Sequence, residues 1–192
     1  KRLKDTAGVS FCRLKVNCRN TRDIATCSHG LSGIGNPKIR EKDKQPEYSV
    51  RHLFYKSPEN LVKEIKTQVN DLLLRLNNLA PESRTIAILA ADQDFLPPEI
   101  NGKGFFNAPV SNMEDAAPWQ IKIGTLQSFK GLEASAVILL GLENLDKSLD
   151  KELMYVGGTR AMLFLRIIVH EQNKTTLIEK QPDVLKLRQL LS

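Results

Sequence analysis

Four short segments of the sequence are predominantly apolar, at residues 85–91, 121–126, 136–140 and 164–169. A strand covered on both faces lacks the alternation of apolar and polar residues that a solvent-facing strand shows. Residues 57–79 and 149–162 carry apolar side chains at helical spacing and lie beside or between these segments. Strands that alternate with helices are typical of a parallel sheet with helices on both faces. The sequence therefore predicts an α/β fold, a three-layer α/β/α domain with a mainly parallel sheet.

Local signals mark where several elements begin. Asn20 or Thr21 can cap a helix over residues 22–30, and Ser57 followed by Pro58 is a strong start for the helix over residues 57–79. Shorter strands are expected over residues 11–16 and 51–55, and a C-terminal helix over residues 182–191. Residues 32–50 and 92–120 are rich in glycine, proline or charge and are expected to be irregular.

Bulk properties favour one domain with an anionic partner. A chain of 192 residues suffices for one domain with a core, and the formal net charge of +6 favours nucleic acid or nucleotide phosphates. Neither a signal peptide nor an apolar run of about 20 residues is present, so we expect a cytoplasmic protein without a membrane partner. The three cysteines, Cys12, Cys18 and Cys27, contain no C-x-x-C pair, so free thiols are expected rather than a metal site.

Three motifs lie next to the predicted strands: NCRNT at residues 17–21, GTLQSFKGLE at residues 124–133, and YVGGTRA at residues 155–161. We expect residues 128–133 at the carboxyl ends of strands, where such sheets bind ligands. In their order, the motifs resemble N-Y-R-N/S, T-x-H-x-x-K-G-L-E and Y-V-A-x-T-R-A of the second RecA-like motor domain of UvrD/Rep-like superfamily-one helicases. The resemblance spans residues 14–169, and its last two motifs are the specific ones.

The resemblance implies a RecA-like fold and an ATP cleft shared with an N-terminal motor domain. Arg19 and Arg160 match the family's γ-phosphate arginines, and a guanidinium suits this role because it binds phosphate through two parallel hydrogen bonds. Glu133 matches an acid near the nucleotide ribose, beside Gly131 and Lys130, and a glycine lets the backbone approach a bound group closely. The implied cofactor is ATP with Mg²⁺, with the magnesium ligands expected on the N-terminal domain.

Other positions of the motifs point to a second ligand. Thr125, Gln127 and Ser128 match positions that face the single strand in the family, where hydroxyl and amide groups can bind phosphate or sugar. The implied partner is single-stranded DNA or RNA. Two positions depart from the family pattern: Gln127 replaces a histidine, and Cys18 replaces the tyrosine that stacks on adenine, which removes that aromatic surface. A further expectation concerns residues 157 and 158, where two glycines inside a helix indicate close packing.

The sequence contains no phosphate loop of the form G-x-x-x-x-G-K-S/T. We therefore expect residues 1–192 to form a single motor domain without an inserted accessory domain, supplying one wall of an ATP cleft and inactive by itself. Asp92 and Asp94 are expected to cap the turn after residues 85–91 rather than to bind magnesium.

Two functions remain open. The chain is either the C-terminal motor domain of a larger ATP-dependent helicase or translocase, or a non-catalytic nucleic-acid or nucleotide-binding module that retains the fold. A first residue of Lys1 rather than methionine favours a fragment of a larger helicase, as do the two arginines Arg19 and Arg160.

Overall fold

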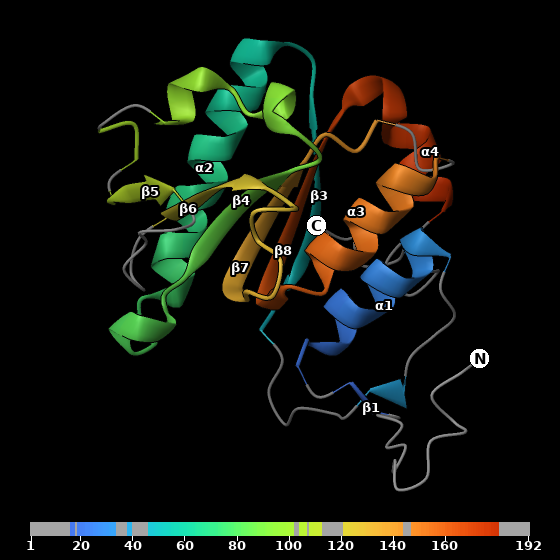
Figure 1. The fold of residues 1–192 in the computed structure, drawn as a ribbon, viewed down its shortest axis with the longest axis horizontal. Coiled ribbons are helices and arrows are strands. Elements are labelled where there is room, and N and C mark those ends of the chain that lie inside the picture. Colours follow the sequence, from blue (N-terminus) through green and yellow to red (C-terminus); the bar gives the residue numbers. More distant parts are fainter. Residues whose placement is uncertain are drawn as a thin grey trace, which may run out of the picture.

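A six-stranded parallel sheet forms the centre of the molecule, with the strand order β3-β8-β7-β4-β6-β5 (Figure 1). The computed structural model describes residues 16–17, 19–33, 38–39, 46–101, 104–106, 108–112, 121–143 and 147–180. The strands of the sheet are β3 Val50–Tyr55, β4 Ile86–Ala90, β5 Val110–Asn112, β6 Ile121–Thr125, β7 Ala134–Leu140 and β8 Ala161–His170. A separate parallel pair joins β1 Val16–Asn17 to β2 Lys38–Ile39. The predicted α/β fold with a parallel sheet is confirmed.

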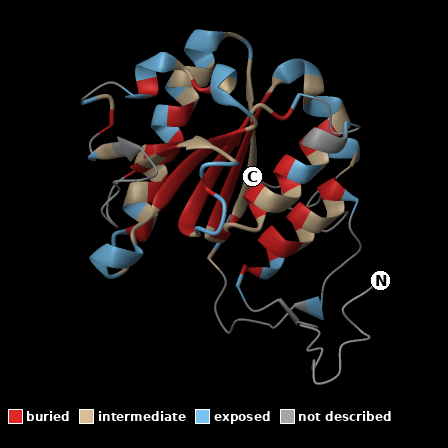
Figure 2. Cartoon of the chain, viewed as in Figure 1, coloured by how far each residue is buried: buried red, intermediate tan, exposed pale blue. Residues whose placement is uncertain are grey.

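Helices cover both faces of this sheet, as Figure 1 shows. They are α1 Arg22–Ser32, α2 Pro58–Leu76, α3 Ser148–Gly158 and α4 Lys174–Glu179, together with the 3₁₀ turns η2 Pro81–Ser83, η3 Gln93–Phe95, η4 Pro98–Asn101 and η5 Glu171–Asn173. Side chains of α1, α3 and α4 form one core layer with the sheet, and α2 forms a second layer on the opposite face. Burial is concentrated in the strands and the inner helix faces (Figure 2). No helix in the described ranges is both long and apolar enough to cross a membrane.

The helix starts follow their sequence signals. Thr21 Oγ1 accepts a hydrogen bond from the backbone N–H of Ile24, which caps α1. Ser57 caps α2 through the N–H of Asn60, and Pro58 occupies the first turn. The inner face of α2 buries four apolar residues at the predicted spacing, Ile65, Val69, Leu72 and Leu76.

Several boundaries differ from the sequence-based expectation. The helix predicted over residues 149–162 ends at Gly158, and β8 begins at Ala161, because Ala161 pairs with Ala134 of β7. Two short strands, β2 and β5, lie in the regions expected to be irregular, and α4 is an additional helix. Cys18, most of the strand predicted over residues 11–16, and the helix predicted over residues 182–191 lie outside the described residues.

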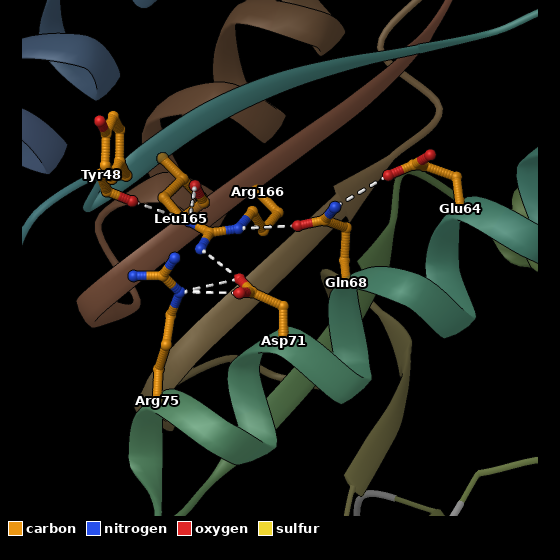
Figure 3. Close-up of polar contacts among 7 residues, drawn as sticks. All are labelled: Tyr48, Glu64, Gln68, Asp71, Arg75, Leu165 and Arg166. Carbon is orange, nitrogen blue, oxygen red and sulfur yellow. Dashed lines mark hydrogen bonds and ion pairs between the residues drawn. The ribbon is translucent and has the colours of Figure 1, made fainter. Parts of the chain in front are cut away.

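A charged side chain lies in the middle of the apolar strand β8. Arg166 is 0% exposed, and its guanidinium donates to Gln68 Oε1 at 3.0 Å, to Asp71 Oδ2 at 3.2 Å and to the carbonyl of Tyr48 at 3.1 Å (Figure 3). Asp71 also accepts from Arg75 Nε at 2.9 Å, so two helix residues and a loop carbonyl surround the buried guanidinium. The contacts of Arg166 with Gln68, Asp71 and Tyr48 tie β8 to α2 and to the turn before β3.

The network keeps its charges at neutral pH. Burial lowers the pKa of Arg166 to about 10, while the hydrogen bond and the charge of Asp71 act in the opposite direction. Partial burial alone would raise the pKa of Asp71, but the hydrogen bonds from Arg75 and Arg166 outweigh it and hold that pKa below its usual value. The buried ion pair is therefore a pair of charged groups and not of neutral ones.

A second buried contact joins α1 to β3. Nε2 of His52 lies 3.8 Å from Sγ of Cys27, a free thiol in the core. Burial lowers the pKa of His52 to about 3, and burial together with the nearby charge of Asp23 raises the pKa of the Cys27 thiol. Both groups are therefore neutral at pH 7, and Cys27 is a core residue rather than a reactive thiolate.

Lowering the pH from 7 to 5 will reduce the free energy of unfolding by about 1–2 kcal/mol through His52. The unfolded imidazole gains a proton as the pH falls through its ordinary pKa of 6.5, whereas the folded one gains it only near pH 3. Stability present above pH 6.5 is therefore lost as the pH falls through this window. We expect less than the full shift because the residue keeps partial solvent exposure.

Urea unfolding at pH 7 and pH 5 measures this effect. His52→Gln removes the contribution, and a His170→Gln control retains it because His52 is intact. The same loss of stability in His52→Gln and in the unchanged chain would show that another group titrates.

Candidate functional site

The first and second motifs meet at the edge of the sheet where β7 and β8 begin. Glu133 precedes β7, Arg160 precedes β8, and Ala134 pairs with Ala161 directly after them. Arg19, which lies between β1 and α1, reaches this edge through an ion pair of 2.7 Å between its Nε and Glu133 Oε1. The side chains are 47% and 34% exposed, so solvent reaches both groups of the pair.

Asn20 attaches the first motif to the third. Its Nδ2 donates to the carbonyl of Thr159 at 2.9 Å and to the carbonyl of Ala161 at 2.6 Å, and the residue is 1% exposed. The carbonyl of Arg160, which lies between these two acceptors, accepts from the N–H of Ala134 at 3.1 Å. Three consecutive carbonyl groups of the turn between α3 and β8 are therefore hydrogen-bonded.

Arg160 itself has an unsatisfied donor. Its Nε is buried and has no hydrogen-bond partner among the described residues, although the side chain as a whole is only partly buried. A buried donor without an acceptor costs about 1–3 kcal/mol, more when it is charged. Guanidinium groups form charge-assisted hydrogen bonds with phosphate oxygens. The two arginines give this edge a chemistry that suits a phosphate-bearing ligand, which would reach the buried Nε of Arg160 only after that side chain moved.

The two glycines before Arg160 lie where helices and sheet approach closely. A Cβ on Gly157 would lie 2.7 Å from Leu139 Cδ2, and a Cβ on Gly158 would overlap Ser28 Oγ of α1. The predicted close packing at these glycines is confirmed. Gly131 differs from them: its φ of 85° requires glycine, and no atom lies within 4 Å of the position that a Cβ would take.

The loop at residues 126–133 crosses from one edge of the sheet to the other. The N–H of Leu126 donates to the carbonyl of Ala90 at the carboxyl end of β4, whereas Glu133 lies at the amino end of β7. Both β6 and β7 run parallel to β4, so the chain must return along the sheet between them. Phe129, midway along the loop, is 0% exposed and packs in the core layer of α1 and α3. The expectation that residues 128–133 lie together at carboxyl ends is therefore wrong for Glu133.

The predicted nucleic-acid residues lie at the carboxyl end of β6. Ser128 Oγ donates to the carbonyl of Thr125 at 2.7 Å, and Thr125 Oγ1 accepts from the N–H of Ser128 at 3.4 Å. Gln127 is exposed between them, and Lys130 is exposed farther along the loop. The structure thus separates these hydroxyl and amide groups from the arginines, which lie at the opposite edge of the sheet.

The structure shows which ion pair Glu133 forms and what role Asp92 has. The spacing of Lys130 and Glu133, three residues apart, also allows an ion pair between those two residues. Glu133 pairs with Arg19, so the Lys130–Glu133 pair that the spacing allows is not the contact that forms. Asp92 Oδ1 accepts from the N–H of Asp94 at 2.9 Å, which confirms its role as a turn cap. Within the described ranges, no group of three or more histidine, cysteine or acidic residues could hold a metal ion.

Sequence reasoning considers Asn20 only as a helix cap. Its contacts with Thr159 and Ala161 depend on the packing of α1 against the turn before β8, which no local pattern encodes. Two features of the sequence point to a different role for Asn20. It directly follows Arg19 in the first motif, and the next residue, Thr21, already caps the helix.

Comparisons with known proteins find a likeness to a solved structure. No protein-family model and no curated protein matches the sequence. Among solved structures, the C-terminal domain of a possible DNA helicase from Lactobacillus plantarum WCFS1 matches with a TM-score of 0.54 and 19% sequence identity. The match covers 80% of this chain and 87% of that domain. At this identity the likeness shows a common fold, which agrees with the RecA-like architecture.

Proposed function

We propose that this chain is the C-terminal, second RecA-like motor domain of an ATP-dependent DNA helicase or translocase of the UvrD/Rep-like superfamily one. The observation that carries the proposal is the unpartnered, buried Nε of Arg160 beside the Arg19–Glu133 pair at one edge of the sheet. Three motifs distant in sequence supply these groups. The fold shared with a domain of a possible DNA helicase supports the same assignment.

In this proposal, the edge formed by the starts of β7 and β8 faces ATP and Mg²⁺ held by an N-terminal motor domain. Arg19 and Arg160 bind the γ-phosphate and stabilise the charge that develops during phosphoryl transfer. Glu133 accepts hydrogen bonds from the ribose, and Lys130 and Gly131, which precede it in the same loop, complete the assigned nucleotide-binding residues. The magnesium ligands belong to the opposing domain, because the phosphate loop that positions them is absent from this sequence.

The Arg19–Glu133 pair sets a condition on this assignment. The ion pair occupies Nε of Arg19 and Oε1 of Glu133. Phosphate would therefore meet the remaining guanidinium N–H groups of Arg19, and the ribose would meet the remaining lone pairs of Glu133. Any separation of the two side chains costs little, because an exposed ion pair contributes only about 0–1 kcal/mol.

The opposite edge supplies part of the single-strand track, through Thr125, Gln127 and Ser128. These groups are neutral, so they add hydrogen bonds to phosphate or sugar without adding charge. The net charge of +6 supplies the general attraction to the strand.

Binding of a single strand will be weak, indifferent to base sequence and steeply dependent on salt. Gln127→Ala will weaken it about threefold to tenfold by removing a hydrogen bond, with the slope against salt concentration unchanged. Fluorescence anisotropy of a labelled oligonucleotide at several salt concentrations measures both quantities. A matched control is Gln172→Ala, an exposed glutamine at the same edge but beyond β8, three strands away from β6. Salt-insensitive binding that prefers one base sequence would contradict the proposed track.

A further inference from the structure

Asn20 makes contacts that a helix cap does not need. The cap of α1 is Thr21, whose hydroxyl binds the N–H of Ile24. The side-chain amide of Asn20 instead donates to the carbonyls of Thr159 and Ala161. An asparagine amide has two N–H donors, so one side chain satisfies both carbonyls. The residue is also buried, which makes each unsatisfied group costly.

The turn that receives these bonds joins α3 to β8. The N–H of Arg160 donates to the carbonyl of Gly157 and the carbonyl of Arg160 accepts from the N–H of Ala134, whereas the carbonyls of Thr159 and Ala161 receive their bonds from Asn20. Thr159 ends α3, where helix carbonyls lack partners within the helix. The two hydrogen bonds from Asn20 therefore fix the backbone on both sides of Arg160, and they fix it to the residue that directly follows Arg19.

We propose that Asn20 is a positioning residue that holds Arg160, and through the backbone Arg19, in the arrangement that binds a polyphosphate. The inference rests on the proposed function, because it assumes that Arg160 meets phosphate. Without the two hydrogen bonds from Asn20, the backbone on both sides of Arg160 shifts, and the Arg160 side chain moves with it. Asn20 touches no reacting atom in this scheme and acts only through the two arginines.

Nuclear magnetic resonance on the ¹⁵N-labelled chain tests the inference, with inorganic tripolyphosphate as the probe. The Nε–Hε signal of Arg160, assigned by its absence in Arg160→Lys, reports the surroundings of this buried donor. Asn20→Ala and the isosteric Asn20→Asp, which cannot donate, will shift or broaden this signal. Both will weaken tripolyphosphate binding about threefold to tenfold, the loss expected when the displaced Arg160 gives up one hydrogen bond to phosphate.

Thr21→Ala is the matched control. It removes an equally buried neighbour and loosens the start of α1, but it leaves the carbonyls of Thr159 and Ala161 bonded. We expect it to keep both the Arg160 signal and the affinity. If Asn20→Ala does not fold, Asn20→Ser, which keeps a hydroxyl donor, replaces it, with an intermediate effect expected.

The outcomes separate the two proposals. An unchanged Arg160 signal and affinity in the Asn20 variants, with weaker binding in Arg160→Ala, would overturn the role of Asn20 and leave the proposed function standing. Equal binding by Arg160→Ala and the unchanged chain would overturn the proposed phosphate site. Equal changes in Thr21→Ala and Asn20→Ala would show that Asn20 only stabilises α1, which also overturns the inference.

Discussion

Replacing Asp71 by alanine will lower the free energy of unfolding by about 3 kcal/mol, the lower end of the cost of breaking a buried ion pair, because the Asp71 side chain is 29% exposed. The substitution leaves the fully buried guanidinium of Arg166 without its carboxylate, while the hydrogen bonds to Gln68 and the carbonyl of Tyr48 cannot neutralise its charge. Thermal unfolding and urea titration at pH 7 measure the loss. For a domain of this size, we expect a fall of roughly 10 °C in Tm.

Two further variants identify the cause of that loss. Glu64→Ala removes a carboxylate that contacts Gln68 but not Arg166, so it should cost less than about 1 kcal/mol. Arg166→Met combined with Asp71→Ala removes both charges and should recover much of the stability, because apolar side chains often replace buried ion pairs without loss. A loss in Asp71→Ala no larger than that in Glu64→Ala would contradict the assigned importance of the network.

Replacing Arg160 by alanine will reduce ATP turnover by about 10³–10⁵-fold when the chain operates with a phosphate-loop motor domain. Nucleotide binding will weaken far less, because the guanidinium acts mainly on charge that develops in the transition state. Arg19→Ala should behave similarly. Steady-state hydrolysis stimulated by single-stranded DNA, together with nucleotide titrations, measures the two effects separately.

Lys63→Ala, on the exposed side of α2, is the control for this experiment and should keep normal turnover. Arg160→Lys keeps the positive charge but not the planar fork, so it should restore only a small part of the activity. Normal turnover in Arg160→Ala would make the arginine structural. The alternative function, a binding module without catalysis, would then become the better assignment.

Elements with local signals are predictable from the sequence. The cap Ser57, the proline Pro58 and the spacing of the apolar residues define the start and the inner face of α2 without reference to the rest of the chain. The start of β8 is different, because Ala161 joins the sheet by pairing with Ala134. Helical spacing continues through these residues, so the sequence-based helix extends too far.

The candidate site is likewise predictable from the sequence only in part. The motifs associate Arg19, Glu133 and Arg160, and the structure brings Arg19 onto Glu133 and Asn20 onto the turn around Arg160. The path of the loop after β6 is not predictable from the motif, because it depends on β6 and β7 pairing with opposite sides of β4. This arrangement requires a full return along the sheet and separates the two halves of one motif.

The partners of Arg166, the buried arginine of β8, cannot be identified from the sequence. Arg166 stands in an apolar segment, and Gln68 and Asp71 stand near the buried face of α2, so each is visible in the sequence as a polar residue at a core position. Their association depends on α2 packing against β8, and Arg166 follows Gln68 by 98 residues and Asp71 by 95 residues. Local patterns identify the residues, and only the tertiary fold pairs them.

The place of β8 in the sheet affects how the chain acquires its structure during synthesis. This strand is the last of the sheet in sequence, yet it lies between β3 and β7, where Val50 pairs with Leu165. As the polypeptide leaves the ribosome, β3 has no neighbour in the sheet until nearly all described residues have emerged. Pairing between such distant segments is slow, and open strand edges can associate with other nascent chains in the meantime. The sheet is thus closed only when β8 enters between β3 and β7, and until then the edges of both strands remain open.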